Sequence, residues 1–404
     1  MLLLLLKYLA SLGIKIPAVF SYSSTRMMLA AITSLLATIV LGPAFIKKLY
    51  QLKTGQSIRV EDCPVLAELH KKKKDTPTMG GSLILFSMSL SLLLWMDLTN
   101  VFTLILLLVS LWLGGLGAID DYLKMARKNA KGLNPKKKFG WQIVLSAVLS
   151  LYLFSPSIQQ AISSQNWFRA PQARDFSINS ETKQKVAVNL KTDEYMSRYY
   201  VPFYKEPLIT LGKGALLLGG CFLAFVLTGA SNAVNLTDGL DGLAAGTIVL
   251  TAVVLAVFAF ASGNVEIARY LNILYIEGSA EIGIYLCGLI GGCLGFLWYN
   301  GHPAQIFMGD TGSLALGGVL GIAAILLRRE LVLALAGGIF VIEAISVILQ
   351  VGSYKLRNKR RIFLCAPLHH HFEYKGWSET KVVLRFWIIG LILAIIALLS
   401  IKFQ

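Results

Sequence analysis

Ten apolar runs, each close to the length that crosses a lipid bilayer, recur along this chain of 404 residues. A membrane-spanning helix needs about 20 mainly apolar residues, because the hydrocarbon core is about 30 Å thick. The runs lie at residues 27–46, 81–96, 101–119, 141–154, 214–229, 243–261, 282–299, 314–328, 331–352 and 384–401. We therefore expect an all-α polytopic integral membrane protein of about ten transmembrane helices, with one transmembrane domain over residues 1–404.

The composition agrees with a membrane protein and excludes a soluble globular one. Hydrophobic residues make up 55% of the chain and charged residues 15%, and the mean hydropathy is +0.65. The net charge of +16 comes from basic residues that flank apolar runs without interleaved aromatic residues, so we expect no nucleic-acid partner. The apolar start, residues 1–12, is short and lacks a convincing cleavage site, which favours a retained interfacial or half-inserted helix over a signal peptide.

The polar motifs fall in alternate loops between the apolar runs. An alternating path through ten spans places the loops after spans one, three, five, seven and nine on one membrane face. Those loops carry the acidic and histidine motifs and most of the lysine and arginine, so the positive-inside rule makes that face cytoplasmic and places both termini outside. The exception is segment 156–212, an extended polar loop on the opposite face.

Asp120 and Asp121 end the third predicted span. Neighbouring helical side chains point about 100° apart, so one carboxylate would bind a ligand while the other supports it. The alternative is a solvated helix end paired with Lys124. Other carboxylates on the same face favour the functional interpretation.

The fifth loop carries polar side chains at a spacing of three. Asn232, Asn235, Asp238 and Asp241 would lie next to one another on a helical surface and form an oxygen-rich wall. Gly239 and Gly242 would let a ligand approach the backbone. A capped turn is the alternative, but it needs only one such residue.

Asp310 stands among glycines just before the eighth predicted span, in Gly309–Ser313. It could cap that helix, or it could bind Mg²⁺, which takes oxygen ligands together with water and substrate phosphates. We favour the metal.

The run His369, His370 and His371 is a weak zinc motif, because consecutive histidines do not easily ligate one ion. Contacts with a phosphate or diphosphate fit better. The lysines at 71–74 and 124–138 serve topology and lipid headgroups first, with one or two expected to touch substrate. Glu343, inside the ninth span, has no assigned role.

Six motifs, taken in order, carry a family resemblance. They are Thr76–Gly81, Ile119–Tyr122, Asn232–Gly242, Trp298–Asn300, Phe307–Ser313 and Pro367–Glu373. The set resembles the polyprenyl-phosphate N-acetylhexosamine-1-phosphate transferases. Within that family, the histidine run and Arg385–Trp387 resemble motifs of the branch whose substrate is a phospho-muramoyl-pentapeptide. The other relatives transfer N-acetylglucosamine phosphate. The match runs from about residue 27 to the C-terminus, and segment 156–212 is longer than the family usually has.

The resemblance implies a homodimer in the bacterial inner membrane with an active site that faces the cytoplasm. The implied reaction transfers phospho-MurNAc-pentapeptide from UDP-MurNAc-pentapeptide to undecaprenyl phosphate, with Mg²⁺ as cofactor. Its products are lipid I and UMP, and it is the first membrane step of peptidoglycan synthesis in cell-wall biogenesis.

The resemblance also implies roles for individual residues. Asp310 would bind Mg²⁺, with Asp120 and Asp121 near the lipid phosphate and as candidate further ligands; His369 completes the catalytic set. The nucleotide pocket would be lined by Asn235, Asp238, Gly239, Leu240, Asp241, Asn300, Phe307 and Gln350. The phosphates and sugar would meet Lys73, Thr78, Lys124, Lys128, His369, His370 and His371. Asn232, Gly309 and Ser313 complete the substrate-binding residues.

The chemistry brings several negative charges together, which metal and cations must offset. The lipid phosphate ionises near neutral pH, so direct attack assisted by Asp120 is favoured over a covalent intermediate on Asp310. A sister transferase for another sugar nucleotide is the nearest rival. A polyprenyl-lipid transporter, the rival from another class, would show broken spans and polar groups near the midplane.

Overall fold

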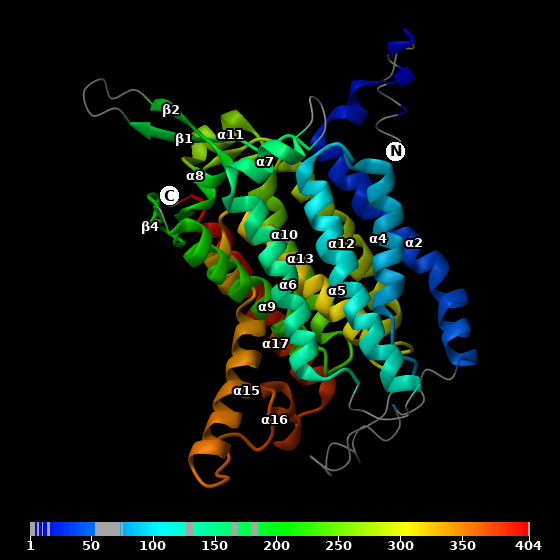
Figure 1. Ribbon diagram of the computed structural model, residues 1–404. Coiled ribbons are helices and arrows are strands. Elements are labelled where there is room, and N and C mark those ends of the chain that lie inside the picture. Colours follow the sequence, from blue (N-terminus) through cyan, green and yellow to red (C-terminus); the bar gives the residue numbers. More distant parts are fainter. Residues whose placement is uncertain are drawn as a thin grey trace.

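The computed structural model describes residues 17–52, 76–126, 132–163, 168–178, 185–212 and 214–402, together with 5, 8, 9, 11–13 and 73. These residues form a nearly all-helical bundle (Figure 1), which confirms the expected fold class. Most of the helix expected over residues 1–12 lies outside the described residues. Lys128 also lies outside them.

The ten predicted spans all fall on helices of the bundle. The long helices are α2 (Ser23–Gln51), α4 (Gly81–Trp95), α5 (Val101–Ala126), α6 (Pro135–Phe154), η3 with α9 (Ala215–Gly219, Gly220–Thr237), α10 (Leu243–Ser262), α12 (Ala280–Asn300), α13 (Gly309–Leu326), α15 (Gly338–Leu356) and α17 (Glu379–Leu399). Within the described residues, eight helices are long and apolar enough to cross a membrane. The bent pair that begins with α6 is a ninth candidate, and α4, at 15 residues, is shorter.

Three helix boundaries differ from the expectation. The ninth predicted span is broken at Gly337, so that α14 (Glu330–Ala336) precedes α15. Helix α6 is followed, after a bend of 91°, by α7 (Pro156–Ile162). Helix α5 continues to Ala126, so Asp120 and Asp121 lie within the helix and not at its end.

Segment 156–212 is folded where the structure describes it. Strands β1 (Ala173–Ile178) and β2 (Lys185–Leu190) pair antiparallel, with Ala173 opposite Leu190, and β1 also pairs with β5 (Tyr275–Ile276). A second hairpin joins β3 (Arg198–Tyr199) to β4 (Ile209–Thr210). The remaining short helices are η1 (Ala18–Ser21), α8 (Thr192–Met196), α11 (Val265–Leu271) and α16 (Leu368–Tyr374).

Helix α13 lies at the centre of the bundle, packed between α5 and α9. Every residue from Thr311 to Leu326 is buried. Several of these residues are glycine or alanine, which lets neighbouring backbones approach closely, as is usual in membrane bundles. The first turn of α13 is therefore held in position by helices on both sides.

The helix ends that carry the polar motifs meet at one end of the bundle. The C-terminal ends of α5, α9 and α12 lie there with the N-terminal ends of α4, α6 and α13, beside α16 (Figure 1). Strands β1 and β2 and helices α7, α8 and α11 lie at the opposite end. For the residues that the structure describes, this arrangement confirms that the polar motifs of the alternate loops gather at one end of the bundle.

Candidate active site

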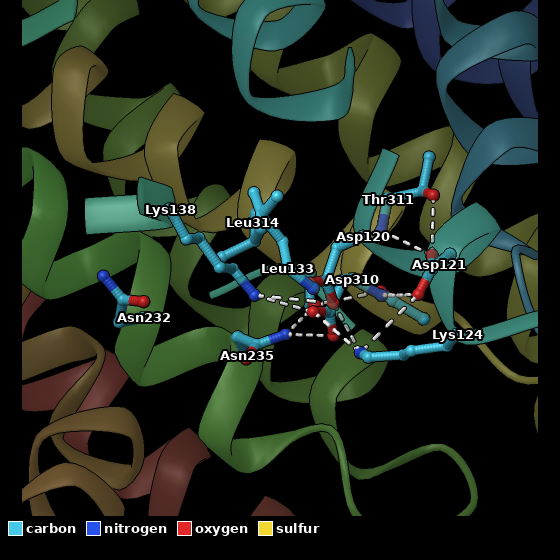
Figure 2. Close-up of polar contacts among 12 residues, drawn as sticks. Asp120, Asp121, Lys124, Leu133, Lys138, Asn232, Asn235, Asp310, Thr311 and Leu314 are labelled. Carbon is cyan, nitrogen blue, oxygen red and sulfur yellow. Dashed lines mark hydrogen bonds and ion pairs between the residues drawn. The ribbon is translucent and has the colours of Figure 1, made fainter. Parts of the chain in front are cut away.

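Three aspartates converge where the C-terminal part of α5 meets the first turn of α13 (Figure 2). Asp120 and Asp121 come from α5, and Asp310 from the first turn of α13. One carboxylate oxygen from each lies within 4.8 Å of the others. Asp120 and Asp121 are only 3% and 2% exposed, so the alternative of a solvated helix end is wrong.

Two lysines direct their ammonium groups into this cluster. The Nζ atoms of Lys138 and Lys124 lie 2.6 Å and 3.0 Å from Asp310 Oδ2, and Lys124 Nζ lies 2.6 Å from Asp120 Oδ2. Three carboxylates against two ammonium groups leave a negative excess. The cluster therefore attracts a further cation, and its lysines are available to anionic groups of a ligand.

Asp121 holds the start of α13 in place. It accepts hydrogen bonds from the backbone N–H groups of Asp310 and Thr311, at 3.2 and 2.9 Å, and from the Thr311 hydroxyl at 2.7 Å. The N-terminal end of a helix has unpaired N–H groups, and a carboxylate there satisfies them. The helix cap is thus supplied by α5, and the expected alternative, Asp310 as an N-cap, is wrong because Met308 occupies that position.

Asp120 ties the loop that follows α5 to the cluster. Its Oδ1 accepts the backbone N–H of Leu133 at 2.7 Å, just before α6 begins. Helix α6 starts at Pro135, with Asn134 as its N-cap. Lys138 then lies one turn into α6, which directs it to Asp310.

Gly117 allows α5 and α13 to come close enough for the three carboxylates to meet. A Cβ atom on Gly117 would lie 2.2 Å from the backbone oxygen of Asp310, a distance that no side chain can occupy. The glycine therefore sets the separation of the two helices at the site.

The donor set fits Mg²⁺. The three carboxylates present oxygen atoms within reach of one ion, and Mg²⁺ takes carboxylate oxygens together with water and substrate phosphates. Both oxygens of Asp121 already accept hydrogen bonds from α13. A cation would consequently compete with the lysine ammonium groups for the carboxylates of Asp310 and Asp120.

The polar side chains of the fifth loop do not form one helical ladder, and that expectation is wrong. Helix α9 ends at Thr237, Asp238 is its C-cap, and Asp241 lies in the turn before α10. Asn235 donates to Asp310 Oδ1 and to Ser313 Oγ, both at 2.8 Å. Asn232 points away from the acids and donates to Gln142 at 2.9 Å (Figure 2).

Asp238, in the same turn, is an acid whose pKa is affected by the three-aspartate cluster. Burial raises the pKa of Asp238 to about 7, and the negative charges of Asp310 and Asp121 add to the rise. The backbone N–H of Gly309 donates to this carboxylate and lowers the pKa in part. Asp238 is therefore partly protonated near neutral pH.

Asp241 belongs to a second group of charges. Lys73 Nζ lies 2.6 Å from Asp241 Oδ1 and 2.5 Å from Glu379 Oε1, and His302 Nδ1 lies 3.0 Å from Asp241 Oδ2. Asp241, His302 and Glu379 offer ligand atoms close together, but the Lys73 ammonium already pairs with both carboxylates. The Lys73 ammonium also lies 5.9 Å from the centre of the Phe307 ring.

Several predicted site residues bond to or pack against the backbone around these two groups. Asn300 is buried; it donates to Ile306 O and accepts from Gly242 N–H, at 2.8 and 3.0 Å. Gln350 holds the loop before α16 through Ile362 and Phe363. Thr78 lies against Gly309, and Leu240 is buried in a small apolar cluster with Phe386.

The three histidines of α16 differ in their surroundings. His369 is fully buried beside Glu343, His370 Nδ1 lies 2.7 Å from Glu373 Oε2, and His371 Nδ1 accepts the N–H of Leu364 at 3.1 Å. Only His370 and His371 retain partial exposure. The three therefore cannot act as one equivalent phosphate-binding set.

Three polar residues of the site, Lys138, Glu379 and His302, were not singled out from the sequence. Lys138 stands in a run of three lysines, and the helix start at Asn134–Pro135 is the signal that selects it. Glu379 looks like a first-turn acid of α17. His302 stands alone in a loop, and nothing in the sequence links it to Asp241.

Fold and site together define a multi-pass membrane protein with a carboxylate and lysine centre at one end of its helices, a centre suited to a divalent cation and phosphorylated ligands. Residues 103–328 match the family model of glycosyl transferase family 4. The chain is 61% identical over 396 residues to a phospho-N-acetylmuramoyl-pentapeptide-transferase of Protochlamydia amoebophila (strain UWE25), covering 97% of each chain. It is also similar to proteins of the same name from Thermodesulfovibrio yellowstonii and Desulfotalea psychrophila, at 45% and 44% identity over 96% of this chain and 95% of each relative.

The chain belongs to glycosyl transferase family 4 and, within it, to the phospho-N-acetylmuramoyl-pentapeptide-transferases. The resemblance that the ordered motifs carry is thereby confirmed.

Proposed function

We propose that this protein transfers phospho-MurNAc-pentapeptide from UDP-MurNAc-pentapeptide to undecaprenyl phosphate and releases UMP. Relatives that carry the name of this activity match nearly the whole chain. The product, lipid I, would be the first membrane-bound precursor of peptidoglycan. The observation that carries the proposal is the buried cluster of three carboxylates and two lysines at the end of the bundle.

The cluster suits a reaction between two phosphorylated substrates. Asp310, with Asp120 beside it, would hold Mg²⁺ at the site. Bound there, the ion would neutralise charge on the diphosphate and polarise its oxygens. Lys124 and Lys138 now pair with Asp310, and once a cation takes their place they can donate to phosphate oxygens.

Each acid would then have a separate task. Asp121 keeps the start of α13 fixed and remains bonded to it. Asp120 would orient the lipid phosphate for direct attack on the diphosphate, with UMP as leaving group. Phosphoryl transfer depends mainly on positioning and charge stabilisation, so no covalent intermediate on Asp310 is required.

The group of Asp241, His302, Lys73 and Phe307 is a candidate nucleotide pocket. It combines the aromatic ring of Phe307, backbone polar groups and Lys73, whose ammonium group can pair either with a carboxylate or with a ligand. Binding of the nucleotide would take Lys73 from Asp241 or Glu379. Asp238 is close enough to both groups for the charges of Asp310, Asp121 and Asp241 to raise its pKa, as expected if one extended substrate spans both.

The site lies at helix ends, which suits a lipid acceptor whose phosphate stays at headgroup level. The excess of basic residues in the loops at this end supports a cytoplasmic orientation in a bacterial inner membrane. A homodimer is the further expectation that the family resemblance brings.

Release of UMP by detergent-purified protein tests the proposal. We expect release from UDP-MurNAc-pentapeptide with undecaprenyl phosphate and Mg²⁺, and none with EDTA. Release from UDP-N-acetylglucosamine instead would assign the chain to a sister activity. No release from either sugar nucleotide would contradict a transferase function.

A further inference from the structure

Glu343 carries a carboxylate in a place where an unpaired charge is costly. Its side chain is fully buried in α15. The carboxylate lies beside the ring of His369. Removing a carboxylate from water is unfavourable unless hydrogen bonds and an opposite charge compensate, so its presence calls for a specific reason.

The carboxylate contacts His369 at two points. Oε1 accepts the backbone N–H of His369 at 3.1 Å, and Oε2 lies 3.2 Å from ring atom Nδ1. Helix α15 thus holds both the main chain and the ring at the start of α16. The second contact is within hydrogen-bond distance but is not aligned as a hydrogen bond.

The opposite edge of the ring faces the turn that carries the site acids. A Cβ atom on Gly239 would lie 2.3 Å from His369 Nε2, so the ring reaches the backbone directly after Asp238. His369 is itself fully buried, and Nε2 has no hydrogen-bond partner. A buried polar atom without a partner is uncommon and indicates a group kept for a ligand or a moving element.

We infer that Glu343 is a positioning residue, which acts on the reaction through His369. A carboxylate can only accept, so the proton on Nδ1 points to Glu343 and Nε2 is presented to the turn at Asp238–Asp241. Hydrogen bonds of this kind are often misaligned before substrate binds and tighten afterwards. The inference rests on the proposed function, since it assigns Nε2 to the nucleotide-sugar side of the site.

In a purely structural role, Glu343 would only hold α15 and α16 together. Such a contact would stabilise the fold but would not determine which nitrogen of the His369 ring carries the proton. Two measurements therefore distinguish a positioning role from a structural one. The first is the protonation of the His369 ring, and the second is whether the effect of changing Glu343 depends on His369.

The first measurement is ¹⁵N NMR of histidine-labelled protein in detergent. The chain has only five histidines, and His369→Asn identifies the signal. We expect the wild-type signal to report a protonated Nδ1, and Glu343→Gln to change the protonation pattern or broaden it by exchange. An unchanged His369 signal in Glu343→Gln would overturn the inference, whether or not the protein turns over substrate.

The second measurement is a double-mutant cycle on UMP release. Glu343→Gln should lower kcat by roughly 10- to 100-fold with a smaller change in KM, as is typical when the residue that orients a functional histidine is changed. In a His369→Ala background the same substitution should have no further effect. Losses that multiply, or a wild-type kcat in Glu343→Gln, would overturn the inference.

Glu281→Gln is the matched control. Glu281 is also buried, in α12, and it pairs with Arg26 at 2.6 Å away from the aspartate cluster. It should retain its kcat, and melting temperatures of both glutamine variants show whether each is folded. If wild-type protein released no UMP, the proposed function would fail, while the NMR result would still decide the role of Glu343.

Discussion

At the scale of single residues, the three aspartates differ in their contacts: Asp121 accepts hydrogen bonds from the start of α13, while Asp120 and Asp310 pair with lysines. Asp120, Asp121 and Asp310 were predicted to share a face, and the structure brings them together. The division of their roles follows from contacts between residues that lie 190 positions apart, such as the hydrogen bonds that Thr311 donates to Asp121. Local spacing carries no information about such contacts, so the pairing of Lys138 with Asp310 could not be predicted from the sequence.

Lys138→Ala tests whether that lysine serves the reaction. We expect a loss of roughly 10- to 100-fold in kcat/KM, because a charge-assisted hydrogen bond contributes about 1.5–3 kcal/mol. Lys137→Ala is the control, since Lys137 is exposed on the same turn. Equal rates for both variants in the UMP assay would show that Lys138 serves only topology.

Asp238 makes the stability of the metal-free protein depend on pH. Burial raises its pKa from 3.8 to about 7, so the folded chain binds this proton more tightly than the unfolded chain. Its contribution is fully present below about pH 4 and is lost as the pH rises through 7. In EDTA, the melting temperature should fall between pH 5 and pH 7.5, and Asp238→Asn should reduce that slope; an identical slope in both proteins would contradict the assignment.

At the scale of elements, apolar runs located the helices but not their ends. The ladder from Asn232 to Asp241 failed because a spacing of three does not reveal where a helix stops. Here α9 ends at Thr237, and Gly242 adopts a left-handed φ of 78° before α10. The ninth span likewise read as one helix, because the break between α14 and α15 falls at glycines inside an apolar run.

The contact between α5 and α13 can be tested with one methyl group. Gly117→Ala places a Cβ atom 2.2 Å from the Asp310 carbonyl oxygen, so the helices must separate, at a cost of about 1–3 kcal/mol. Gly115→Ala on the same helix meets nothing within 4 Å. We expect only Gly117→Ala to lower both the melting temperature and UMP release. Equal behaviour of the two variants would show that this contact does not set the geometry of the site.

At the scale of the whole molecule, hydropathy and loop charge predicted the bundle and the gathering of polar motifs at one end. Figure 1 shows the folded part of segment 156–212 at the other end. Its strands were not expected, because a long polar segment in a membrane protein shows little periodicity. The charge rule assigns the site to the cytoplasm, and that assignment remains a prediction.

Fusions at the C-terminus test the orientation. If the C-terminus lies outside, alkaline phosphatase fused after residue 404 should be active, and a fluorescent protein fused there should stay dark. The opposite pattern would place the aspartate cluster on the outer face, away from a cytoplasmic nucleotide. Fusions after residue 133, just before α6, should give the reverse result and serve as the control.

The central claim is that the three-aspartate cluster is a metal-dependent transfer centre with Asp310 as the main ligand. The most direct measurement is the Mg²⁺ dependence of UMP release by Asp310→Asn beside wild-type protein, with melting temperatures to confirm folding. We predict that the folded variant loses activity by at least about 100-fold at every Mg²⁺ concentration. Full turnover by Asp310→Asn with the Mg²⁺ dependence of the wild type would contradict the claim.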